Sequence, residues 1–126
     1  MAKILLADDS IDVASMLCEM LMREGHHVDV VYNGRKLVER VDNGGAYDVI
    51  FTDLLMPDLD GFGAIRHLRN KGVKTPVFVM SGGGVTLNSD DALRAVEAMA
   101  TGIMKKPVRC ADLIEKIQSV SLESAG

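Results

Sequence analysis

Five short apolar runs recur along the chain, about 20 to 30 residues apart, with a helical pattern in each gap. The runs cover residues 3–7, 27–31, 48–52, 76–80 and 102–104. We interpret them as continuous rather than alternating, which is typical of strands covered by helices on both faces. The pattern therefore predicts repeated β-α units around a parallel sheet.

The segments between these runs carry helix start and stop signals. The five helices are expected from Ser10 or Ile11 to Gly25, from the N-cap Asn33 to residues 43–45, after Gly61, from residues 88–90, and from about Cys110 to Val120. The first helix places apolar residues at spacings of three and four, namely Val13, Met16, Leu17, Met20 and Leu21. We expect its methionines to fill the core.

With 126 residues, the chain has the length of one domain with its own hydrophobic core. The predicted fold is α/β, a flavodoxin-like doubly wound five-stranded parallel sheet with strand order 2-1-3-4-5 and helices on both faces. We expect the domain to span residues 1–122. Residues 123–126 are then a short tail with no output domain.

Composition and charge exclude several classes of function. The net charge is −4 and no run of Lys or Arg stands out, so direct nucleic-acid binding is not expected. No segment has the length of a signal-peptide core or a membrane span, which predicts a cytoplasmic protein without membrane insertion. Cys18 and Cys110 have no neighbouring ligand at metal-binding spacing and are expected to be reduced structural thiols.

The residues with candidate chemistry lie where the predicted strands end. Asp8 and Asp9 follow the first strand, Asp53 the third, Ser81 the fourth, and Lys105, Lys106 and Pro107 the fifth. In the order 2-1-3-4-5 the first and third strands are neighbours, which brings the three acids together. Each like-charged pair would cost roughly 4 kcal/mol at about 4 Å and an effective dielectric near 20. An all-oxygen site of this kind favours Mg²⁺.

A cation, an ammonium and a hydroxyl together can receive a phosphoryl group. Mg²⁺ would neutralise one phosphoryl oxygen, Lys106 a second, and the Ser81 hydroxyl with a loop N–H the third. Asp53 is then the nucleophile that forms an acyl phosphate. Adjacent strand residues point to opposite faces, so only one of Lys105 and Lys106 can reach this pocket. Asp58 and Asp60 are expected to form turns rather than bind the metal. Gly61 is expected to start the next helix in a backbone conformation that a side chain would forbid.

This ordered set resembles the response-regulator receiver domain of two-component signalling, in its single-domain, chemotaxis-regulator-like form. The resemblance runs from Lys3 to about Val120 and rests on Asp8-Asp9, Asp53 in "DLLMPDLDG", Ser81, and Lys106 in "KKPV". The lysine next to the proline is the one that the resemblance selects. The resemblance also implies a cis Lys106-Pro107 peptide.

Further implications of the resemblance concern ligands and partners. Asp9 and Asp53, with Asp8 close by and the backbone carbonyl of Leu55, would hold Mg²⁺. A histidine kinase or phosphotransfer protein would donate the phosphoryl group, and a downstream protein target would read the modified state. The domain would catalyse only its own phosphorylation and dephosphorylation, and is not otherwise an enzyme.

One departure concerns the switch. Many receivers carry Tyr or Phe three residues before the lysine, where this chain has Ile103. We therefore expect signalling to pass through Ser81 and the glycines Gly82, Gly83 and Gly84 instead.

Three other classes of protein differ from the receiver domain in the residues they require. An aspartyl-phosphate hydrolase usually has a second acid two residues after the nucleophile, where this chain has Leu55. An FMN carrier needs a Ser/Thr/Gly-rich loop after the first strand, where this chain has two acids. A receiver-like interaction module that is not regulated by phosphorylation would lack part of the five-residue set, which is complete here.

Overall fold

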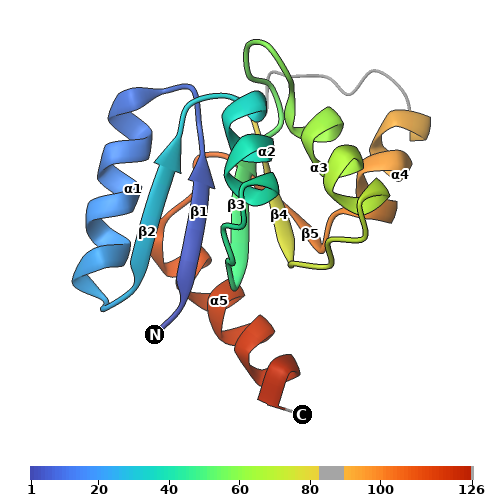
Figure 1. Cartoon of the computed structure of the whole chain (residues 1–126). Helices are drawn as coiled ribbons and strands as arrows, with labels where there is room; N and C mark the ends of the chain where they lie inside the picture. Colours follow the sequence, from blue (N-terminus) through green and yellow to red (C-terminus); the bar gives the residue numbers. More distant parts are fainter. Residues whose placement is uncertain (83–89, 126) are drawn as a thin grey trace.

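The computed structural model describes residues 1–82 and 90–125. Within these ranges five strands alternate with five helices (Figure 1). The elements are β1 Lys3–Ala7, α1 Ile11–Arg23, β2 His27–Val31, α2 Gly34–Asp42, β3 Val49–Asp53, α3 Gly61–Asn70, β4 Val77–Ser81, α4 Asp90–Met99, β5 Gly102–Lys105 and α5 Cys110–Ala125. In this part of the chain, no helix has the length and hydropathy needed to cross a membrane.

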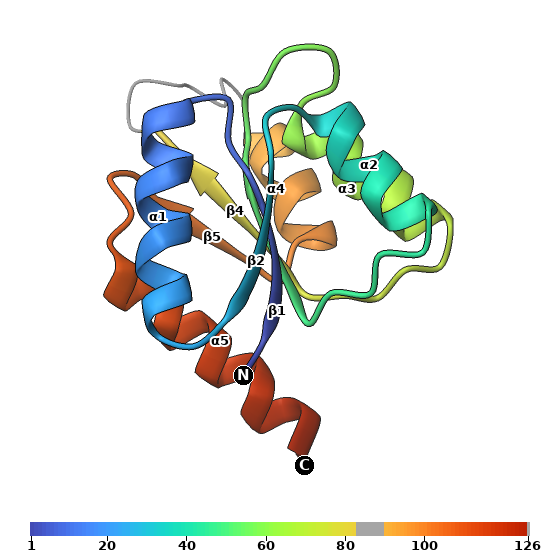
Figure 2. The ribbon, with the colours of Figure 1, turned by 60° about the vertical axis from the view of Figure 1, so that its left-hand side comes forward.

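The strands form one parallel sheet in the order β2-β1-β3-β4-β5. Figure 2 shows α1 and α5 on one face of the sheet and α2, α3 and α4 on the other. Each face has its own apolar core, one built around Leu17 and Leu113 and the other around Leu37 and Ile65. The predicted flavodoxin-like fold, its strand order and its two helical layers are therefore confirmed.

Two strands begin and end one residue later than the apolar runs indicate. The runs at residues 48–52 and 76–80 become β3 Val49–Asp53 and β4 Val77–Ser81. The backbone ladder extends past the last apolar residue of each run, because Asp53 pairs with Met80 and Ser81 pairs with Lys105. Two polar candidates thus belong to strands rather than to loops.

Strand β2 does not follow the expected continuous burial. Only Val31 is fully buried in it, because β2 lies at the edge of the sheet and pairs with β1 alone. The polar Asp29 in its middle accepts a hydrogen bond from the Tyr47 hydroxyl at 2.7 Å. The prediction of continuous burial is therefore wrong for β2, although Val28 and Val30 pack against one core and Val31 against the other.

The methionines of α1 do not fill the core, contrary to the sequence prediction. The buried residues of this helix are Ala14, Leu17 and Leu21, whereas Met16, Met20 and Met22 are 50%, 37% and 58% exposed. A single stripe at spacings of three and four covers the sheet, and the neighbouring positions turn toward solvent. The methionine side chains of α1 therefore lie on the protein surface and do not pack in the core.

This distinction has a measurable consequence for stability. Leu17→Ala should lower the free energy of unfolding by about 2 to 5 kcal/mol, because it leaves a cavity in a closed core. Met16→Ala should change it by less than about 0.5 kcal/mol, because the side chain is half exposed and both residues favour helix. Urea denaturation of the two variants measures the difference. Equal losses would contradict the assignment of the buried face.

Side chains cap the first three helices at their N-termini. Ser10 accepts a hydrogen bond from Val13 N, Asn33 from Lys36 N, and Asp60 from Gly63 N. Asp60 is thus a helix cap rather than the predicted turn residue, whereas Asp58 has a positive φ of 68° in the preceding turn, as predicted.

Of the last two helices, only α5 differs from its expected bounds. Helix α4 begins at Asp90, within the predicted start at residues 88–90, and residues 88–89 lie outside the described residues. Helix α5 continues to Ala125 rather than ending near Val120, because residues 121–125 contain no helix breaker. The division into a domain of residues 1–122 and a tail stays a prediction.

Candidate phosphoryl and metal site

Three carboxylates meet at the C-terminal edge of the central strands. Asp8 and Asp9 follow β1, Asp53 ends β3, and one oxygen from each lies within 4.8 Å of the others. Asp8 is fully buried and Asp53 is 7% exposed, whereas Asp9 is open to solvent. The adjacency of β1 and β3 thus brings together the three acids that the sequence predicted.

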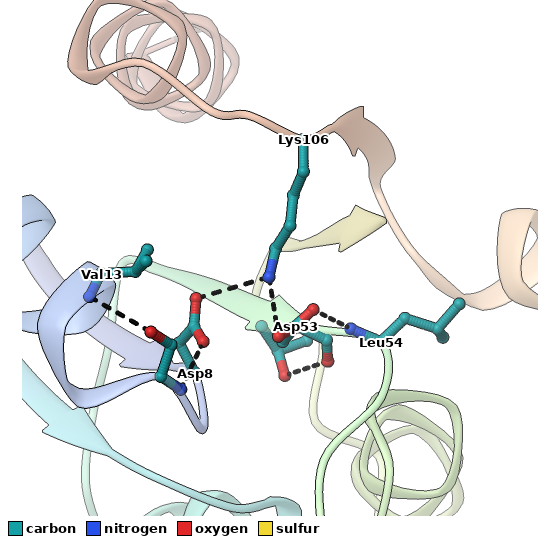
Figure 3. A network of polar contacts seen from close by, with 7 residues as sticks. Asp8, Val13, Asp53, Leu54 and Lys106 are labelled. Atoms are coloured by element: carbon teal, nitrogen blue, oxygen red, sulfur yellow. Dashed lines mark hydrogen bonds and ion pairs between the residues drawn. The ribbon is translucent and has the colours of Figure 1, made fainter. Parts of the chain in front are cut away.

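The ammonium of Lys106 reaches into this acidic cluster from the loop after β5 (Figure 3). Its Nζ lies 2.8 Å from Asp53 Oδ2 and 3.7 Å from Asp8 Oδ2. Lys105, the last residue of β5, is exposed. Of the two candidate lysines, Lys106 is therefore the one in the site.

The two carboxylate oxygens of Asp53 have different partners. Oδ1 accepts a hydrogen bond from the backbone N–H of Leu54 at 3.0 Å, and Oδ2 accepts one from Lys106 Nζ at 2.8 Å. Figure 3 shows these two contacts on opposite sides of the carboxylate. The backbone therefore holds one oxygen, and the other faces the cation.

Burial and charge shift the pKa of both partners in this ion pair. Burial raises the pKa of the Asp53 carboxyl; the hydrogen bond and charge of Lys106 oppose this, and the charges of Asp8 and Asp9 add to it. Burial lowers the pKa of the Lys106 ammonium, but the hydrogen bond to Asp53 and the charges of the three acids outweigh burial and raise it. The site therefore favours bound positive charge.

One oxygen in the cluster has no hydrogen-bond donor in the described part of the chain. Asp8 Oδ1 accepts a hydrogen bond from Ser10 N at 2.9 Å. The buried Asp8 Oδ2 has no hydrogen-bond partner, and the Lys106 ammonium lies 3.7 Å from it. A buried carboxylate oxygen without a donor is costly unless a cation or water meets it. The three carboxylates therefore fit a hard metal ion.

Two further predicted site residues are Ser81, the last residue of β4, and Leu55, two residues past the end of β3. Ser81 ends β4, is half-buried, and accepts Lys106 N at 2.8 Å through its backbone carbonyl. The side chain of Leu55, two residues past Asp53, is 49% exposed. The roles predicted for the Ser81 hydroxyl and the Leu55 carbonyl stay predictions.

The predicted switch region is only partly described. Gly82 is half-buried, and Gly83 and Gly84 lie outside the described residues. Ile103 is half-buried and packs against the core beneath α3 and α4. The Lys106-Pro107 peptide bond is cis, as the resemblance implied.

One residue at the site escaped the sequence interpretation. Thr52 is fully buried and donates its hydroxyl to the backbone carbonyl of Asp53 at 3.0 Å. The signal was a hydroxyl residue inside an apolar run, directly before the acid.

Gly61 was expected to need an unusual backbone conformation, and that reason is wrong. The φ angle of Gly61 is not positive. The glycine is needed because a Cβ at this position would lie 2.4 Å from Asp53 O. The glycine allows the start of α3 to approach the end of β3, a contact that depends on tertiary structure.

Comparison with known proteins identifies the class that this fold and site define. The family model of the response regulator receiver domain matches residues 4–118, so the chain belongs to the receiver-domain family. Members of this family are not enzymes apart from catalysing their own phosphotransfer.

Individual relatives agree with this assignment. The chain is 32% identical over 119 residues to the transcriptional regulatory protein TcrA of Mycobacterium tuberculosis, covering 94% of this chain and 46% of TcrA. It spans about half the length of the curated relatives that it matches first.

Solved receiver structures are similar over their full length. The receiver domain of the Francisella response regulator 1452 matches with a TM-score of 0.84 and 27% identity, covering 98% of this chain and 99% of that one. The chemotaxis response regulator CheY4 of Vibrio cholerae matches with a TM-score of 0.79 and 29% identity, covering 95% and 98%. The chain therefore has the architecture of a two-component signalling receiver.

Proposed function

We propose that Asp53 accepts a phosphoryl group from a histidine kinase or a phosphotransfer protein, and that the modified domain signals by contacting a downstream protein. The observation that carries this proposal is the geometry around one oxygen. Asp53 Oδ2 lies at a strand end, 2.8 Å from the Lys106 ammonium, in a cluster of two further carboxylates. A nucleophilic carboxylate with cationic charge beside it suits phosphoryl transfer.

Mg²⁺ is the cation proposed for the carboxylate cluster. Asp9 and Asp53 would hold it, with Asp8 close by and the Leu55 carbonyl as a further oxygen ligand. Their oxygen donors suit a hard divalent ion, which would neutralise phosphoryl charge when bound.

In the proposed reaction, one Asp53 carboxylate oxygen forms a bond to phosphorus. The bond from phosphorus to the donor's leaving group breaks, and that group departs with the electron pair. Lys106 neutralises one phosphoryl oxygen, and the Ser81 hydroxyl donates to another. Water later cleaves the acyl phosphate, which releases inorganic phosphate and restores the Asp53 carboxylate.

A small phosphodonor tests the proposal directly. The protein is incubated with acetyl phosphate and Mg²⁺, and its intact mass is followed over time. We expect a gain of one phosphoryl group that requires Mg²⁺ and that is lost after the donor is removed. A mass that stays unchanged with Mg²⁺ present would overturn the proposal and favour a receiver-like module that is not regulated by phosphorylation.

The metal assignment makes a separate prediction for Asp9. Asp9→Ala should weaken Mg²⁺ binding by about tenfold or more, because it removes a ligand carboxylate. The measurement is the rise in melting temperature with Mg²⁺ concentration, since a ligand that binds the folded state raises stability. Asp12→Ala, which removes an acid from the first turn of α1 outside the cluster, is the matched control. Equal affinities in the two variants would contradict the role of Asp9.

A hydrolase acting on other aspartyl phosphates or phosphate esters is the alternative to a receiver. The exposed Leu55 in place of a second acid speaks against it. Phosphorylation of Asp53 without release of phosphate from added esters would separate the two functions. The kinase, the downstream target and the cytoplasmic location stay predictions.

A further inference from the structure

We infer that Thr52 is a positioning residue for Asp53, and that its hydroxyl fixes the peptide group that orients the acceptor carboxylate. This inference rests on the proposed function of Asp53. The oxygen concerned is the backbone carbonyl oxygen of Asp53, which accepts no hydrogen bond from a neighbouring strand.

The backbone carbonyl of Asp53 lies beyond the ladder between β1 and β3. The pairing of these strands ends with Ala7 opposite Thr52. The N–H of Asp8, the first residue after β1, faces β2 and donates to Val31 O at 3.1 Å. On the other side of β3, Leu54 N bonds to Met80 O at 3.1 Å, so the Asp53 carbonyl points away from β4. Neither neighbouring strand supplies it with a donor.

Thr52 supplies that donor from within β3. Its hydroxyl, fully buried, lies 3.0 Å from Asp53 O. Within the described residues no other hydrogen bond to this oxygen is present. A buried carbonyl without a donor is costly, so the Thr52 hydroxyl holds this peptide group in its orientation.

Gly61 at the start of α3 restricts the space around the Asp53 carbonyl. Its backbone approaches so closely that a Cβ would lie 2.4 Å from Asp53 O, and its N–H donates to Leu54 O at 2.7 Å. The peptide that joins Asp53 to Leu54 is thus held at its N–H by Met80 O of β4 and at its carbonyl by the Thr52 hydroxyl, and it is confined by the start of α3.

This peptide group orients the carboxylate of Asp53. A peptide is planar, so fixing the carbonyl of Asp53 also fixes the N–H of Leu54. That N–H donates to Asp53 Oδ1 at 3.0 Å, which leaves Oδ2 directed at Lys106. The Thr52 hydroxyl therefore acts on the reacting oxygen through one rigid group (dashed contacts at Asp53 in Figure 3).

Losing the hydroxyl should slow phosphorylation without changing its product. Thr52→Val keeps the β-branched shape but cannot donate, so the peptide and Oδ2 sample more orientations. We expect the rate constant at saturating acetyl phosphate and Mg²⁺ to fall by roughly five- to tenfold, the effect of one lost hydrogen bond.

Two further variants separate positioning from stability. Thr52→Ser keeps the hydroxyl and loses a buried methyl, and should react within about twofold of wild type although it melts lower by about 3 to 6 °C. Thr101→Val removes a hydroxyl that accepts a hydrogen bond from Val77 N at 3.0 Å. Val77 is at the end of β4 that lies away from the acidic cluster. The Thr101→Val variant should lose stability and keep the wild-type rate. Thr52→Ala replaces Thr52→Val if the latter does not fold.

The inference holds if the variant without the hydroxyl is slow and Thr52→Ser is fast, whatever their melting temperatures. It is overturned if the Thr52→Val rate equals wild type, or if rates follow melting temperature across all the variants. If wild type itself gains no phosphoryl group, the proposed function fails and this inference fails with it. Wild-type phosphorylation therefore distinguishes the two failures.

Discussion

Asp53→Asn is expected to reduce phosphoryl incorporation from acetyl phosphate by at least about a thousandfold, to below detection by intact mass. The amide has nearly the shape of the carboxylate, and its oxygen still accepts the Leu54 N–H that now holds Oδ1. The amide lacks the negatively charged carboxylate oxygen that attacks phosphorus. The variant therefore isolates the chemistry from the architecture.

The fold should tolerate this replacement. Burial raises the pKa of Asp53, so the folded protein binds the carboxyl proton more tightly than the unfolded chain does. The ionised side chain consequently opposes folding at pH values above its folded pKa. A neutral amide removes this cost and the repulsion from Asp8 and Asp9, but loses the ion pair with Lys106. We expect a melting temperature at pH 7 within about 4 °C of wild type.

Asp60→Asn is the matched control, because it makes the same acid-to-amide change seven positions along the chain. Asp60 caps α3 by accepting Gly63 N at 2.8 Å, and the amide oxygen of asparagine also caps helices well. Its phosphorylation should equal that of wild type. A phosphoryl group on Asp53→Asn would place the acceptor elsewhere.

Much of the fold and of the candidate site followed from the sequence because both depend on strand ends. Apolar runs mark strands wherever both faces of the sheet are covered, as in β3. In a parallel sheet all strands end at the same edge, so acids after β1 and β3 meet without knowledge of any loop. The position of Asp53 beside Asp8 is thus a property of topology.

The rest depended on contacts between distant segments. Gly61 is needed because α3 starts against the carbonyl of Asp53, and no local pattern reveals that approach. The role of Thr52 depends on the end of the pairing between β1 and β3 at Thr52, which leaves the next carbonyl, that of Asp53, without a donor from β1. The exposure of Met16 follows from how narrow a stripe of α1 the sheet covers. In each case the role depends on tertiary geometry that the residue type alone does not reveal.

Lys106→Ala is expected to slow phosphorylation by acetyl phosphate about a hundredfold, because the phosphoryl oxygens lose a charged donor in a partly desolvated site. The Lys106 ammonium is 2.8 Å from Asp53 Oδ2, next to the oxygen that attacks phosphorus. Removing it also leaves Asp8, Asp9 and Asp53 without their nearby ammonium. The variant should therefore melt lower than wild type without metal and recover most of the difference in Mg²⁺, which still binds the carboxylates.

Lys105→Ala provides the control, since it removes the same charge from the adjacent, exposed position at the end of β5. Its rate and its melting temperature should stay close to wild type, because a solvated lysine contributes little. The decisive measurement is the time course of intact mass for both variants, with melting curves recorded in EDTA and in Mg²⁺. A slow Lys105→Ala with a normal Lys106→Ala would reverse the choice of lysine. Equal Mg²⁺ rescue in both would instead show that the Lys106 ammonium does not offset the charge of the acidic cluster.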